Sequence, residues 1–178
     1  MHVAHPAHQG AAVCILETHA LNVRDPVRGL ARIVQLHEQM TLIDLTVKGL
    51  APGDYGVTVR ECGDISRGTA STGGIWGSST GTLLEKELPK GLIGRVQVDQ
   101  DGRGGVFLEC SFQVWEILGR SMVLSRSLGG TTPEDNPNTL VGVIARSAGV
   151  WDNDKTVCSC SGKTLWEERE ENVVRGML

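Results

Sequence analysis

Two cysteines near the end of this 178-residue chain, Cys158 and Cys160, have the type and spacing best suited to chemistry. In extended backbone, residues two apart point the same way with their Cα atoms about 6.5 Å apart. Modest bending then allows two thiolates to hold one Cu(I) ion, or to close a strained disulfide that exchanges easily. Half of a zinc site, or two incidental cysteines, are the alternatives, because no second Cys or His pair lies nearby in the sequence.

The other three cysteines predict less chemistry. Cys14 and Cys110 lie in apolar strand patterns, which are typical of buried and unreactive thiols. Cys62 precedes a Gly-Asp turn, where an incidental thiol is also favoured. The run 161–164, Ser-Gly-Lys-Thr, resembles the end of a phosphate-binding loop, but that loop requires a glycine where Val157 stands. Nucleotide binding at this run is therefore excluded.

Charge and histidine content exclude several classes of function. The net charge is −4, so no positive excess drives binding to nucleic acid. No apolar run approaches the ~18 residues that span a membrane, and residues 1–9 lack the apolar core of a signal peptide. A hydrolytic triad would have to use His19 or His37, because no histidine follows them. An odd, modest number of cysteines favours a reducing compartment, so we expect a cytoplasmic protein.

The elements that must position these residues are predicted to be strands. Twenty-three glycines and few aromatic residues favour a turn-rich all-β fold. Residues 40–47 alternate between apolar and polar side chains, which predicts an antiparallel sheet with one buried face. The turn at Asp99–Arg103 predicts a hairpin. Eight strands are expected, at 13–16, 27–36, 40–47, 56–61, 95–98, 106–109, 120–124 and 140–146, as in a β-sandwich or barrel.

Three parts of the chain follow from these patterns. Residues 1–9 are predicted to be a disordered N-terminus, residues 10–149 a sandwich domain, and residues 150–178 a C-terminal tail carrying the Cys-x-Cys pair. Two long irregular loops, 64–91 and 129–138, interrupt the strands. Within the tail, Thr164 and Glu167 form a capping-box pattern, so a short helix is expected from Leu165 to about Val174.

Several blocks of sequence resemble known families. The blocks 53–64, 99–102, 119–124 and 140–145 resemble successive parts of Cu,Zn superoxide dismutase, whose fold is an eight-stranded Greek-key β-sandwich or barrel. The continuation through 146–151 and 157–169, which includes Cys158 and Cys160, is similar to the family of copper chaperones for superoxide dismutase. The resemblance implies a dismutase-like docking domain followed by a reactive tail.

Departures from the enzyme imply that the sandwich holds neither copper nor zinc. Thr58 and Arg60 stand where the dismutase has its His-x-His copper pair, and Ser125 stands at the third copper ligand. A guanidinium cannot ligate copper and repels it. Loop 64–91 contains no histidine, so the family's zinc site is absent as well. The positions of the enzyme's disulfide and active-site arginine are also altered: they read Thr69, Val141 and Asn138.

The resemblance implies a metallochaperone and not an enzyme. It would dock on immature Cu,Zn superoxide dismutase as a heterodimer and promote copper loading and disulfide formation through Cys158 and Cys160, with Cu(I) as a transient cargo. The docking face implied by the family consists of Cys62, Gly63, Leu118, Gly119, Ile144, Ala145 and Arg146. A self-complementary face of this kind also implies a homodimer when the protein is alone.

Other interpretations stay open at this point. One is a dismutase-like enzyme with unfamiliar metal ligands, and another is a non-catalytic docking scaffold with an idle tail. The Met-x-Cys-x-x-Cys motif of the family's N-terminal copper domain is absent, so the chain is expected to be either a fragment or a variant that obtains copper otherwise. The resemblance implies a cytoplasmic location, with the mitochondrial intermembrane space as a second one.

Overall fold

The computed structural model describes residues 10–78, 88–127 and 136–148. The chain divides after Ser147 into two units, and nearly everything described here belongs to the first. Cys158, Cys160, the helix predicted from Leu165 and the predicted N-terminal segment 1–9 lie outside the described residues, so these expectations stay predictions.

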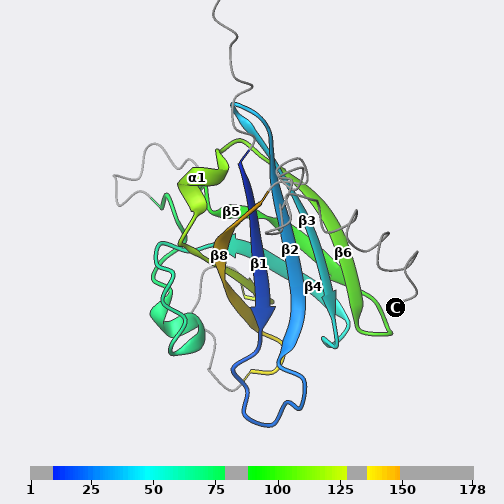
Figure 1. Cartoon of the computed structure of the whole chain (residues 1–178). Coiled ribbons are helices and arrows are strands. Elements are labelled where there is room, and N and C mark those ends of the chain that lie inside the picture. The colour runs from blue at the N-terminus through cyan, green and yellow to red at the C-terminus, as the bar shows by residue number, and fades with distance from the viewer. Residues whose placement is uncertain (1–9, 79–87, 128–135, 149–178) are drawn as a thin grey trace, which may run out of the picture. The chain divides into compact units, whose positions relative to one another are not determined.

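The described residues form a closed antiparallel barrel, in the order β1-β2-β3-β6-β5-β4-β7-β8 (Figure 1). The neighbours β3 and β6, and β4 and β7, are not consecutive in the chain, so the connections cross between strands as in a Greek key. The strands are β1 (Ala11–Glu17), β2 (Val27–His37), β3 (Met40–Lys48), β4 (Gly53–Val59), β5 (Leu92–Val98), β6 (Arg103–Cys110), β7 (Ser121–Ser125) and β8 (Leu140–Ser147). The expected eight-stranded all-β fold is confirmed.

Two short helical elements lie outside the strands. The 3-10 helix η1 spans Gly68–Ser71, and α1 spans Val114–Ile117. At the start of α1 the Gln113 amide donates to the Glu116 carboxylate at 2.9 Å, one half of a capping box that the Gln-x-x-Glu spacing encodes. No helix in the described part of the chain has the length and apolarity needed to cross a membrane.

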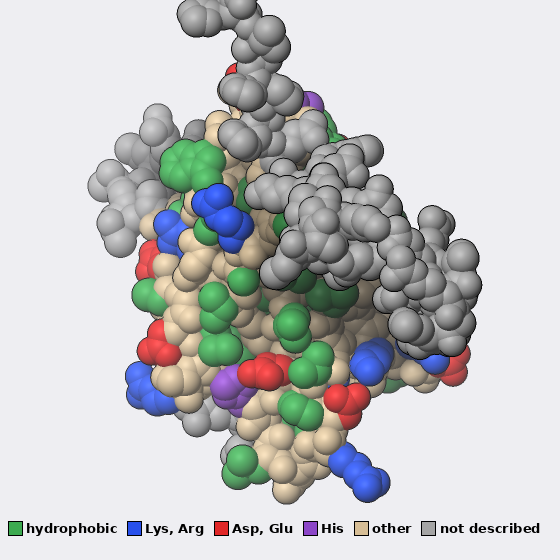
Figure 2. All heavy atoms as spheres, in the orientation of Figure 1, with side chains coloured by type: hydrophobic (Ala, Val, Ile, Leu, Met, Phe, Trp, Pro, Cys, Tyr) green, Lys and Arg blue, Asp and Glu red, His purple; other side chains and the backbone are tan. Residues whose placement is uncertain are grey.

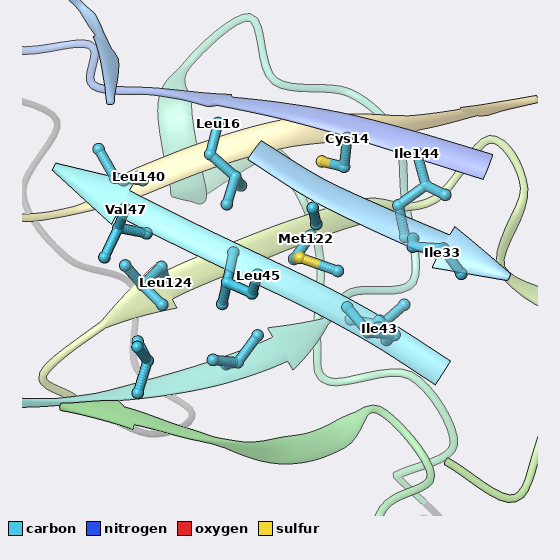
Figure 3. Close-up of a cluster of buried hydrophobic side chains, with 14 of the residues drawn as sticks. Cys14, Leu16, Ile33, Ile43, Leu45, Val47, Met122, Leu124, Leu140 and Ile144 are labelled. Atoms are coloured by element: carbon cyan, nitrogen blue, oxygen red, sulfur yellow. The ribbon is translucent and has the colours of Figure 1, made fainter. Parts of the chain in front are cut away.

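The barrel interior is filled by the alternate residues of each strand. In β3, Thr41, Ile43, Leu45 and Val47 are buried, which confirms the predicted alternation. Figure 3 shows how the inward side chains of β1, β2, β3, β7 and β8 gather into one apolar cluster. Removing a large side chain from such a core costs about 2–5 kcal/mol of the free energy of unfolding.

The turn between β5 and β6 also agrees with its prediction. The carboxylate of Asp99 accepts hydrogen bonds from the amides of Asp101 and Arg103 at 2.9 and 2.8 Å, and Gly102 has φ +74°. Beyond this turn the two fully described strands pair at one position, Val98 with Gly104.

Several strand bounds differ from their predictions: β5 and β6, for example, each begin three residues earlier than expected, and β4 is shifted at both ends. We expected residues 56–61, whereas β4 spans Gly53–Val59. It begins earlier because Gly53 and Asp54 already pair with β5. It ends earlier because Arg60 forms only an isolated bridge, to Ile75 in the long loop.

Candidate functional site

Three distant segments meet at one side of the barrel: the turn after β4, the loop after α1, and β8. A Cβ added to Gly63 would lie 2.0 Å from the carbonyl oxygen of Gly119, so the two backbones touch and a side chain at position 63 is excluded. The Gly119 amide donates to the Ile144 carbonyl at 2.9 Å, and the Ser121 hydroxyl donates to the Cys62 carbonyl at 2.6 Å. The structure thus brings together the segments predicted for docking.

Side-chain exposure refines which residues of the docking face point outward. Cys62, Gly119, Ala145 and Arg146 are exposed, whereas Gly63 and Leu118 are partly buried. The assignment of the Ile144 side chain to this face was wrong, because it is 1% exposed and packs in the core. Residues of β8 alternate between core and surface, so the neighbouring Val143, 37% exposed, points outward instead.

Two exposed apolar side chains near this face were missed by sequence reasoning. Trp115 on α1 is 68% exposed, three residues before Leu118, and its indole N–H bonds the Gln113 side chain. Ile15 on β1 is 55% exposed between two fully buried neighbours, and β1 pairs with β8. Hydrophobic side chains are visible among charged ones over the face that carries β1, β2 and β8 (Figure 2). The Gln-x-x-Glu pattern was the one sequence signal that could have located Trp115.

A second cluster lies on the outer side of β4 and β7. Thr58, Arg60 and Ser125 are 2, 2 and 3% exposed, on the face opposite the core residues Val57 and Val59. The guanidinium Nε of Arg60 donates to the Thr58 hydroxyl at 3.1 Å. The Ser125 hydroxyl donates to a backbone carbonyl at 2.6 Å. These side chains offer two hydroxyls and a cation, which is not a donor set for copper or zinc.

Arg60 carries a buried charge with little compensation. Its Nη2 atom finds no hydrogen-bond partner within the described part of the chain. Burial lowers the pKa of this guanidinium below its ordinary value. Arginine nevertheless stays protonated at neutral pH, so a positive charge occupies this position permanently.

The remaining cysteines and histidines of the described part of the chain do not assemble into a site. Burial raises the pKa of Cys14 to about 12 and that of Cys110 to about 11, as expected for unreactive thiols. The Nε2 atom of His19 lies 3.9 Å from Oε1 of Glu17. Cys14 is the one cysteine near His19 in the sequence. Among the described residues no group of three or more His, Cys, Asp or Glu side chains is placed to hold a metal. Asn138, at the position of the enzyme's arginine, instead accepts a hydrogen bond from the Ala51 amide at 2.8 Å.

Comparison with known proteins agrees with this geometry. Residues 27–139 match the family model of copper/zinc superoxide dismutase. The chain is 42% identical over 175 residues to the superoxide dismutase 1 copper chaperone of Saccharomyces cerevisiae, covering 90% of this chain and 66% of that protein. It is 39% identical over 185 residues to the chaperone of the same name from Debaryomyces hansenii, covering 96% and 70%. The chain belongs to the family of copper chaperones for superoxide dismutase.

Two further comparisons are with a more distant relative and with a solved structure. It is 34% identical over 174 residues to the human copper chaperone for superoxide dismutase, covering 90% of this chain and 62% of that protein. The chain thus spans about two thirds of the length of these relatives. The solved structure of the clock protein EA4 aligns with a TM-score of 0.60 at 23% identity, covering 82% of this chain and 99% of that one, and shows a shared fold.

Proposed function

We propose that this chain is a metallochaperone that docks on immature Cu,Zn superoxide dismutase and promotes its copper loading and disulfide formation. The observation that carries the proposal is the close contact between Gly63 and Gly119 at the predicted docking face, together with the predicted loss of the metal ligands. Gly63 and Gly119 remain in backbone contact, while Thr58, Arg60 and Ser125 replace the histidines. A chain that keeps the family's contact surface and loses its metal site is suited to recognising a dismutase, not to acting as one.

The shape of this face supports the proposed docking. At Gly119 no heavy atom lies within 4 Å of an added Cβ, so the backbone itself is open to a partner. Exposed Val143 and Ala145 add apolar surface beside it. Dismutase has the same fold, so its corresponding face is the natural complement. The proposal includes a heterodimer with the dismutase monomer and a homodimer of the chaperone alone.

The tail supplies the chemistry in this proposal. Cys158 or Cys160 and one thiol of the client lose two electrons and two protons to dioxygen, and a mixed disulfide forms. The second cysteine of the client, as a thiolate, then attacks the sulfur of the client's first cysteine in the mixed disulfide. This closes the client's disulfide and displaces the tail cysteine as a thiolate. Two soft sulfur atoms also suit Cu(I), so copper handling is assigned to the same pair. We place the protein in the cytoplasm, with the intermembrane space as a second location; the free thiols of Cys14, Cys62 and Cys110 support a reducing compartment.

The test separates docking from chemistry. Metal-free, reduced dismutase is supplied with Cu(I), oxygen and either the unaltered chaperone, Cys158→Ser, Cys160→Ser or the double variant. We expect all four proteins to bind the client equally, and the double variant to leave the client's disulfide open and its superoxide dismutation near background. Full activation by the double variant would show the tail to be idle and would leave docking as the whole function.

A further inference from the structure

The turn of the docking face is joined by backbone hydrogen bonds to the long loop that follows it. The Glu61 amide donates to the Gly74 carbonyl at 3.0 Å, and the Cys62 amide donates to the Thr72 carbonyl at 2.9 Å. Two residues after Gly74, the Trp76 amide donates to the carbonyl of Val59, the last residue of β4, at 2.9 Å. The position of residues 61–63 therefore depends on where the loop around Trp76 is held.

Trp76 is held from several sides. Its ring packs against the barrel core and meets the Phe112 ring edge-on, with the ring centroids 5.6 Å apart. The Arg120 guanidinium carbon lies 5.0 Å from the Trp76 centroid, and the Lys90 ammonium lies 5.7 Å from it. Both distances are within the range of cation–π attraction, and the planar guanidinium is the better partner for an aromatic ring.

Arg120 connects the held ring to the docking face. Its Nη1 atom donates to the Glu61 carbonyl at 2.8 Å, and its Nε donates to the Glu116 carbonyl at 2.9 Å. Its own carbonyl accepts from the Ile144 amide at 2.8 Å. One residue thus contacts the turn after β4, the end of α1, the loop at Trp76 and β8. Within the described residues, neither a disulfide nor a metal cluster makes these connections.

We propose that Arg120, with Trp76 against its guanidinium, is a positioning residue that holds residues 61–63 in the conformation that completes the docking face. This inference rests on the proposed function, because it concerns binding to dismutase. The physical reason is preorganisation: a turn already fixed in its bound conformation loses less conformational freedom when a partner docks. The specificity of the arrangement lies in the forked guanidinium of Arg120, which bonds two backbone carbonyls while its central carbon lies over the Trp76 ring.

The test uses Arg120→Lys, which keeps the charge and loses the fork. A matched control is available in Arg126, whose guanidinium carbon lies 5.3 Å from the Tyr55 ring centroid and whose Nη2 donates to the Pro52 carbonyl at 2.7 Å. Arg126→Lys removes the same two kinds of contact at a different part of the barrel. Trp76→Leu serves as a second variant, because it removes the cation–π contact while retaining an apolar group.

Two measurements on the full chain decide the inference. Hydrogen exchange of the Glu61 and Cys62 amides should accelerate in Arg120→Lys and Trp76→Leu, and stay unchanged in Arg126→Lys. Calorimetric titration with metal-free, reduced dismutase should show binding weakened about tenfold, equivalent to about 1.4 kcal/mol, in the first two variants only. If the unaltered chain fails to bind dismutase, the proposed function fails. If it binds and both Arg120→Lys and Trp76→Leu bind as well as it does, the positioning role alone is overturned.

Discussion

Replacing Gly119 by Glu tests the docking face with little damage to the barrel. Gly119 has φ +75°, a left-handed conformation, and nothing within 4 Å of its added Cβ. The substitution therefore costs backbone strain and no clash, about 1–2 kcal/mol of the free energy of unfolding. Gly63 could not be used in this way, because its added Cβ would lie 2.0 Å from a carbonyl oxygen and the turn itself would move.

The expected effect on association is much larger than the effect on folding. A charged side chain at the centre of a face that buries backbone should weaken binding to reduced dismutase more than about 100-fold, or about 2.7 kcal/mol. Gly49→Glu is the matched control: its φ is +71°, its nearest neighbour is the Arg28 side chain at 3.5 Å, and it lies at the turn after β3. Gly49→Glu should lower the free energy of unfolding by the same backbone strain and should leave docking intact.

Three assays applied to both variants give the answer. Urea denaturation measures the loss in unfolding free energy, circular dichroism checks the fold, and analytical ultracentrifugation with and without dismutase measures both kinds of dimer. We expect equal losses of stability, with loss of association confined to Gly119→Glu. Unchanged association of that variant would refute the assignment of this surface, whatever its stability.

Two further predictions concern metal content and pH. With both tail cysteines changed to serine, the dialysed protein should retain no stoichiometric copper or zinc by elemental analysis. Replacing Thr58, Arg60 and Ser125 by histidine in that variant should restore copper retention. Stoichiometric metal in the variant with only the serine changes would contradict this prediction. For Cys14, burial raises the pKa from 9.0 to about 12, so the folded state holds its proton more tightly than the unfolded state. The protonated Cys14 thiol therefore contributes to the free energy of unfolding. This contribution is fully present below about pH 9 and is lost as the pH rises toward 12, by up to about 1.4 kcal/mol per pH unit. Urea titrations should show this decline, and Cys14→Ala should lack that part of it.

The strands were predictable because their signals are local. Alternation in residues 40–47 and the Asp-Gly turn at 101–102 each depend on a few neighbouring residues, and both agree with the structure. Strand ends were less predictable, since β4 begins at Gly53 because of its pairing with β5, a partner some forty residues later. The buried state of Arg60 has the same origin: nothing in its own segment shows what covers it.

The docking face was located by family resemblance, and one of its members shows the limit of that method. Resemblance aligns residues in the chain, but it does not decide which side of a strand each one occupies, so Ile144 was included and Val143 was not. The arrangement of Trp76 and Arg120 could not be predicted at all. The two residues lie 44 positions apart in the sequence. Trp76 belongs to a loop without periodicity, Arg120 directly precedes β7, and only the folded chain brings them together.

The buried guanidinium of Arg60 has a consequence for the direction of exchange between two proteins that share a fold. A carrier that kept its own copper site would divide the metal with its client according to the two affinities, and an excess of carrier would then starve the client. With a permanent cation in that position, the described cluster of Thr58, Arg60 and Ser125 offers copper no second destination. Under the proposed function, raising the amount of carrier adds delivery capacity without adding a competing reservoir.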